Sequence, residues 1–139
     1  MSEDPGKPPE LAPARKPGWG TWLAIVGLGV LTLEGVLFAL AYAAIASGIL
    51  GGSSQSFTSI ALPMVSAAAV YLLVAIALAR GNRIAFVIAL LLALVPALSW
   101  GYLLATANPL SFELIPLLFV IPSVLVLAGL TASWRDFWR

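Results

Sequence analysis

The side chains that could do chemistry in this chain are few, and the first to stand out is Glu34, inside the apolar run LTLEGVLFAL at 31–40. The 139 residues include no cysteine and no histidine. Thiol chemistry, disulfides, imidazole ligation of metal or haem and catalysis by histidine are therefore excluded. Glu34, Glu113 and several hydroxyl groups remain, and they form no recognisable acid–base pair. We predict that the protein is not an enzyme and holds no metal or cofactor.

The position of Glu34 predicts a carboxyl group near the middle of a membrane. A helix that starts near Trp22 carries Glu34 about 18 Å inward, at about 1.5 Å of rise per residue. A charged carboxylate facing lipid there would cost at least about 2.5 kcal/mol, so we expect a neutral acid, a hydrogen-bonding partner, or both. One interpretation is a proton-coupled site, and the other is a neutral carboxyl group hydrogen-bonded within the bundle or to another subunit. The internal candidates for its partner are the hydroxyls of Ser66, Tyr71, Ser99 and Tyr102.

The elements that must position these residues are four long apolar segments. The chain is 61% hydrophobic and 9% charged, whereas roughly a quarter of the residues in soluble domains are charged. A run of about 20 apolar residues is long enough to cross a bilayer as a helix. We predict a four-helix transmembrane domain at 19–133, with a Pro-rich tail at 1–18 and an aromatic and basic tail at 134–139. Its helices are expected at 19–47, 57–79, 84–105 and 110–132, forming an all-α, up-down antiparallel bundle because the connections are short.

Charge placement predicts how these helices are threaded. All of the Lys and Arg residues lie in the amino tail, in the hairpin around Gly81 or at the carboxyl end. The positive-inside rule then places both termini in the cytoplasm, and we expect a bacterial plasma membrane protein. Tryptophans at the ends of the first and last segments are expected to anchor the chain at the interface. These are Trp19, Trp22, Trp134 and Trp138.

Small residues next to Glu34 predict close helix packing. Gly27, Leu31, Gly35, Ala39, Ala43 and Ser47 recur every four residues. Such a mostly small stripe allows another helix to approach closely. Glu34 lies about 100° around the helix from Gly35, so we expect a helix to run beside the carboxyl group, supplied either by this chain or by another subunit.

Other polar features have simpler interpretations. Glu113 is expected in the first turn of the fourth helix, where negative charge is favoured. The tail contains a bare P-x-x-P at Pro5–Pro8 and could dock on a cytoplasmic partner. Arg15 and Lys16 lie next to the membrane and are expected to contact anionic lipids rather than nucleic acid.

Two families resemble the chain in limited regions. The Glu34 position and the number of helices are similar to the small multidrug resistance transporters, in which a first-helix glutamate couples protons to cation export. The third segment, 84–105, lacks the Gly-rich pattern of that family, so its function is not carried over. The first three segments, with Glu34 and the hairpin RGNR at 80–83, resemble uncharacterised four-helix integral membrane proteins of high-GC bacteria. That resemblance implies a fold and no activity.

These observations leave two functions of different classes. The first is a non-catalytic accessory or structural subunit of a larger inner-membrane complex, such as a respiratory or photosynthetic assembly. It follows from the few catalytic residue types, the small-residue stripe and the aromatic ends, and its expected partners are lipids and other integral membrane subunits. The second is a small oligomeric transporter or channel coupled to protons through Glu34.

Overall fold

The computed structural model describes residues 16–46, 61–106 and 114–138. All four elements in these ranges are helices, namely α1 (Trp19–Ala46), α2 (Leu62–Ala79), α3 (Arg83–Thr106) and α4 (Leu114–Trp138). Each contains a segment long and apolar enough to cross a membrane. The protein is therefore an all-helical, multi-pass membrane protein, as the composition predicts.

The helix boundaries agree with the predicted spans except at one end. Helices α1 and α3 lie within about a residue of the expected 19–47 and 84–105. The predicted starts of the second and fourth helices, at 57 and 110, lie outside the described residues. Helix α4, however, continues past the predicted end at Ala132 to Trp138. The SWRDFW segment is thus part of the helix rather than a tail, because Phe137 is buried against the rest of the bundle.

The hairpin between α2 and α3 is closed by local hydrogen bonds. Gly81 has a φ of 75°, a conformation that residues with a Cβ rarely adopt. Its N–H bonds to the Leu78 carbonyl at 2.9 Å, and the Asn82 N–H bonds to the Ala77 carbonyl at 3.1 Å. This is the Schellman arrangement that ends many helices. The Asn82 side chain then accepts the Ile84 N–H at 2.9 Å and caps the start of α3.

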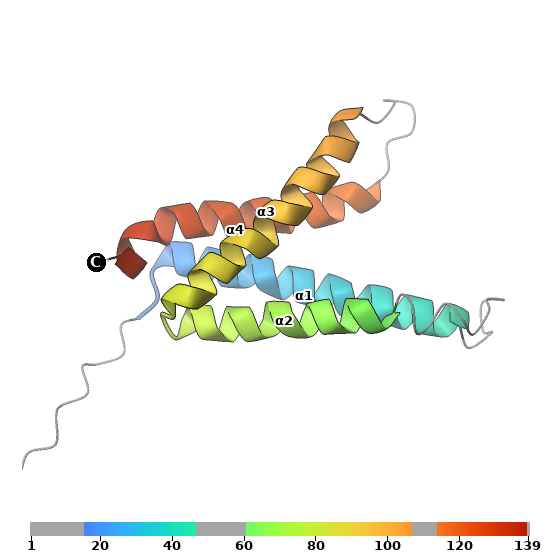
Figure 1. Ribbon diagram of the computed structural model, residues 1–139, viewed down its shortest axis with the longest axis horizontal. Coiled ribbons are helices and arrows are strands. Elements are labelled where there is room, and N and C mark those ends of the chain that lie inside the picture. Colours follow the sequence, from blue (N-terminus) through green and yellow to red (C-terminus); the bar gives the residue numbers. More distant parts are fainter. Residues whose placement is uncertain (1–15, 47–60, 107–113, 139) are drawn as a thin grey trace, which may run out of the picture.

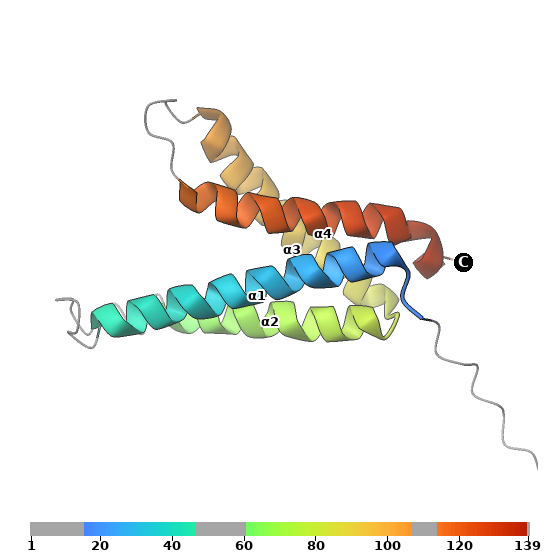
Figure 2. The same ribbon diagram turned by 180° about the vertical axis from the view of Figure 1, so that it is seen from behind.

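Helix α1 lies between α2 and α4 and contacts both along much of its length (Figures 1 and 2). Helix α3 packs mainly on α4 and contacts α2 less. Figure 1 shows why: α3 leaves the hairpin next to α2 and then runs obliquely away from it, toward the far end of α4. The α2 and α3 helices therefore diverge with distance from the hairpin.

The buried core lies in the half of the molecule nearest the hairpin. Its residues come from the first half of α1 and α3 and the second half of α2 and α4. Phe86 of α3 is at its centre, 1% exposed, with its ring centroid 5.0 Å from that of Phe137 and 5.5 Å from that of Trp134. The core members are Ala24, Leu28, Leu31, Val74, Ala75, Leu78, Ala85, Phe86, Ala89, Ala93, Val126, Leu130 and Phe137.

The opposite half is packed differently. Three half-buried rings connect α1, α4 and α3 there: Phe38 stacks on Phe119 at 5.5 Å, and Trp100 stacks on the same ring at 5.3 Å. We call these three residues the aromatic bridge. No ring of α2 takes part in it, in keeping with the divergence of α2 from α3. The bundle is thus tightly packed at one end and more open at the other.

Candidate functional site

Glycines bring the backbones of α1 and α4 into direct contact. A Cβ atom added to Gly129 would lie 2.5 Å from both the Ala24 nitrogen and the Gly20 oxygen. A Cβ added to Gly20 would lie 2.8 Å from the Gly129 oxygen, and one on Gly27 would lie 2.9 Å from the Pro122 oxygen. These distances are shorter than atoms can approach, so the α1–α4 contact requires glycine at all three positions.

A second close contact joins α1 to α2. A Cβ added to Gly35 would lie 3.1 Å from the Cβ of Ala68 and 3.4 Å from the Met64 oxygen. Gly27 and Gly35 therefore face different helices, although the sequence places them on one stripe. The reason is that a step of four residues turns the helix by about 40° more than a full turn, so the two glycines lie about 80° apart.

The other members of the predicted stripe differ in burial. Leu31 is buried in the core cluster, and Ala39 is buried as well. Ala43 is half-buried, and Ser47 lies outside the described residues. The stripe is thus shared between two internal neighbours of α1, rather than being one surface for one helix.

Glu34 lies beside the α1–α2 contact, one residue before Gly35. Its Oε2 atom is buried and has no hydrogen-bond partner among the described residues. Tyr71 of α2 lies within electrostatic range of the Glu34 carboxyl group. Tyr71 is therefore a predicted hydroxyl donor that the fold brings near Glu34.

The remaining predicted donors are bonded to their own helix or exposed. The Ser66 hydroxyl bonds to the Leu62 carbonyl of its own helix at 2.9 Å. Tyr102 is 70% exposed, and Ser99 is also exposed. Among the described residues, none of these four hydroxyls donates a hydrogen bond to the buried Oε2 of Glu34.

Glu34 also marks the boundary between the two halves of the bundle. One turn earlier, Leu31 belongs to the buried core, and one turn later, Phe38 belongs to the aromatic bridge. Along α1, the carboxyl group therefore lies between the buried core and the aromatic bridge.

No protein-family model, curated protein or solved structure matches the chain. Its function has to be inferred from its own residues. Within the described ranges, no group of three or more Asp and Glu residues is placed to hold a metal ion. The orphaned carboxyl oxygen of Glu34 is thus the feature of the membrane-embedded part that most requires a chemical explanation.

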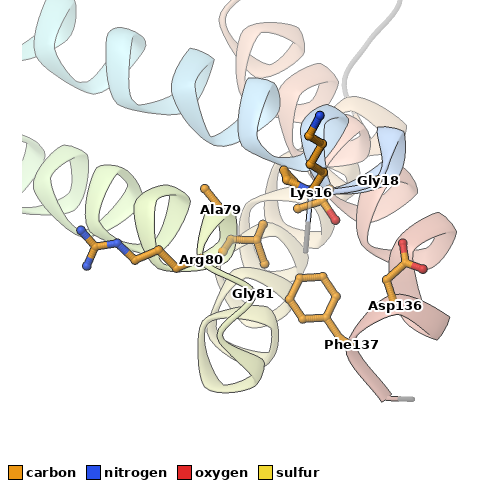
Figure 3. Close-up of a pocket in the computed structure, with 10 residues that line it drawn as sticks. Lys16, Gly18, Ala79, Arg80, Gly81, Asp136 and Phe137 are labelled. Atoms are coloured by element: carbon orange, nitrogen blue, oxygen red, sulfur yellow. The ribbon is translucent and has the colours of Figure 1, made fainter. Parts of the chain in front are cut away.

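A cavity of about 480 Å³ lies at the end of the bundle nearest the hairpin (Figure 3). It is formed by the start of α1 and the ends of α2 and α4. Its lining includes three charged side chains, Lys16, Arg80 and Asp136. The same end carries the four tryptophans predicted as interface anchors, and all four are exposed. They are Trp19, Trp22, Trp134 and Trp138.

Sequence reasoning missed the α1–α4 glycine contact and the cavity. A signal for the first was present, because Gly20 and Ala24 are four residues apart, as are Gly129 and Ser133. The cavity combines residues from three separate segments, which no local pattern reveals. Glu113, Arg15 and the Pro5–Pro8 motif lie outside the described residues.

Proposed function

We propose that the protein is a non-catalytic accessory or structural subunit of a larger membrane complex in the bacterial plasma membrane. The observation that carries this proposal is the buried Oε2 of Glu34, which has no partner in the described chain. A polar atom left unpaired in hydrocarbon costs several kcal/mol. Because the Glu34 side chain as a whole is only half-buried, a helix of another subunit could reach the carboxyl group from outside and donate a hydrogen bond to it. The partner is thus an integral membrane protein with a donor at mid-membrane depth.

The shape of the bundle supports this proposal. Helices α2 and α3 separate beyond the hairpin, and the aromatic bridge between α1, α3 and α4 is only half-buried (Figure 1). Aromatic side chains offer large contact areas, and Glu34 lies at the edge of this region. A helix from another subunit could pack on the bridge and reach the carboxyl group at the same time.

Replacing Glu34 with leucine should weaken assembly, whereas glutamine should preserve it. Glutamine keeps both hydrogen-bonding capacity and size, but leucine removes a bond worth about 1 to 2 kcal/mol between membrane helices. We expect roughly five- to thirtyfold less co-purification of partner subunits for Glu34→Leu in mild detergent. Val36→Leu, at an exposed position on the same helix, is the matched control.

A second candidate function is a small oligomeric proton-coupled transporter, supported by the proximity of Tyr71 to Glu34. In that case Glu34→Gln should abolish proton-linked flux in proteoliposomes while leaving the oligomer intact, because an amide cannot exchange a proton.

Full co-purification of Glu34→Leu with its partners would contradict the accessory role. Unchanged flux for Glu34→Gln would contradict the transporter.

For either function we propose an up-down antiparallel bundle with both termini in the cytoplasm. Contacts that pair Gly20 with Gly129 and Gly27 with Pro122 support the antiparallel course of α1 and α4. Because the chain has no cysteine, single cysteines can report sidedness. In intact cells, cysteines in place of Ser2 and of Asn82 should resist an impermeant maleimide, and one in place of Ser54 should react. The reverse pattern would overturn this orientation.

A further inference from the structure

The cavity at the hairpin end brings together groups that have no role in the functions proposed above. Its apolar wall includes Leu78 of α2 and Phe137 of α4, whose ring lies beside Gly81 in Figure 3. Its polar lining includes Thr21 and the charged side chains of Lys16, Arg80 and Asp136. An apolar wall under a charged rim suits a ligand that has both kinds of surface.

Thr21 supplies a buried hydroxyl group to this cavity. Its side chain is 2% exposed, yet among the hydrogen bonds of the described residues none uses its hydroxyl. Several other hydroxyls in the helices donate to the backbone carbonyl four residues earlier, as for Thr32 with Leu28 at 2.8 Å and Ser133 with Gly129 at 2.9 Å. The Thr21 hydroxyl is therefore free to bond to a ligand in the cavity.

The start of α1 adds backbone donors beside Thr21. The first backbone hydrogen bond of this helix runs from the Trp22 N–H to the Gly18 carbonyl at 3.1 Å. The N–H groups before Trp22 have no acceptor within the helix. Free N–H groups at a helix start favour anions, and phosphate groups in particular.

The described residues of the cavity lining carry two positive charges and one negative charge. Lys16 and Arg80 are exposed, come from different segments, and extend in different directions from the cavity in Figure 3. Asp136 is the one carboxylate among the described residues of the lining, and its Oδ2 would lie 2.8 Å from a Cβ placed on Gly18. It occupies the region where a bound anion would meet the start of α1.

We propose that this cavity binds the phosphate group of an anionic phospholipid. The phosphate would accept bonds from the Thr21 hydroxyl and the N–H groups of the first turn of α1. Lys16 and Arg80, whose charged ends extend outward from the rim, would attract the anion over a longer range. The cavity lies at the ends of the membrane-spanning helices, beside exposed tryptophans, at the depth where lipid headgroups lie. Basic pockets between membrane helices are known to bind such headgroups. The Asp136 carboxylate competes with the lipid phosphate for the free N–H groups at the start of α1.

The test is lipid retention by the purified full-length protein, measured by native mass spectrometry. Phosphatidylglycerol should be retained over phosphatidylcholine with the same acyl chains. Lys16→Gln and Arg80→Gln should each reduce retention about fivefold, whereas Arg135→Gln should not. Arg135 is also exposed at the same end of the molecule but is not among the residues that line the cavity.

Two further variants separate binding from folding. Thr21→Val removes the hydroxyl at nearly constant size and should lower retention without lowering the melting temperature. Asp136→Asn should raise retention, a gain that misfolding cannot produce. Equal losses for Arg135→Gln and Arg80→Gln, or weaker retention by Asp136→Asn, would overturn the proposal. Competition by millimolar glycerol phosphate would show that the site takes free phosphate esters, and would overturn the assignment to lipid.

Discussion

Replacing Gly129 with alanine is expected to destabilise the bundle by about 3 kcal/mol, the upper end of the range for overpacked sites. The added methyl group would lie 2.5 Å from the Gly20 oxygen and the Ala24 nitrogen. Both atoms belong to the backbone of α1, so no side chain can rotate to make room. Helices α1 and α4 must therefore separate, and contacts along their whole length weaken. Unfolding of the purified protein by SDS in mixed micelles measures the loss.

Gly29 provides the matched control for this substitution. It is also a helical glycine, on α1, but a Cβ added there meets nothing within 4 Å. Gly29→Ala should be neutral or slightly stabilising, by up to about 1 kcal/mol, because alanine favours the helix. If Gly129→Ala and Gly29→Ala unfold at the same SDS fraction, the α1–α4 contact is not as close as the structure shows.

The four helices were predictable because the membrane leaves few alternatives. Apolar segments of sufficient length, separated by glycine, asparagine and proline, indicate spans without any knowledge of packing. The helix end at Gly81 is also encoded locally, because glycine readily adopts the positive φ that the structure shows there. These features depend on neighbours in sequence, which a single chain displays directly.

Which helices would meet was not predictable, and α1 shows why. Small residues lie on several of its faces, so a repeat of four can be drawn through Gly27 and Gly35 although they contact different helices. Gly20 and Gly27, seven residues apart, do share a face, because seven residues fall only about 20° short of two turns. The sequence alone does not say which of these repeats a neighbouring helix uses.

The surroundings of Glu34 were predictable only in part. Its place in a membrane helix and its need for a partner followed from the sequence. Of four hydroxyls considered, the fold brings Tyr71 near, while Tyr102 is turned outward. The difference depends on the rotation of α2 and α3 about their own axes. These helices are mostly apolar and carry few polar residues, so the sequence does not define how each one is rotated about its own axis.

Phe86→Ala is expected to destabilise the bundle by about 2 to 3 kcal/mol. The loss should be smaller than the about 3 to 5 kcal/mol found in soluble cores, because a phenylalanine released from the bundle enters lipid rather than water. What remains is the cavity and the lost contact with the rings of Phe137 and Trp134, 5.0 and 5.5 Å away. Since Phe137 holds the last turns of α4 against the core, that end should also exchange amide hydrogens faster.

Tyr102→Ala is the control for Phe86→Ala, because it also removes an aromatic residue from α3 but not from the buried core. Tyr102 lies on the same helix but is 70% exposed, so its truncation should change the free energy of unfolding by less than about 0.5 kcal/mol. Both variants would be unfolded by SDS in mixed micelles, and amide exchange at 130–138 would be followed by mass spectrometry. Equal destabilisation by the two, or unchanged exchange in Phe86→Ala, would mean that the core is not centred on Phe86. The expected result places the rigid part of the protein at the hairpin end, leaving the half that contains the aromatic bridge as the part able to adapt to a partner.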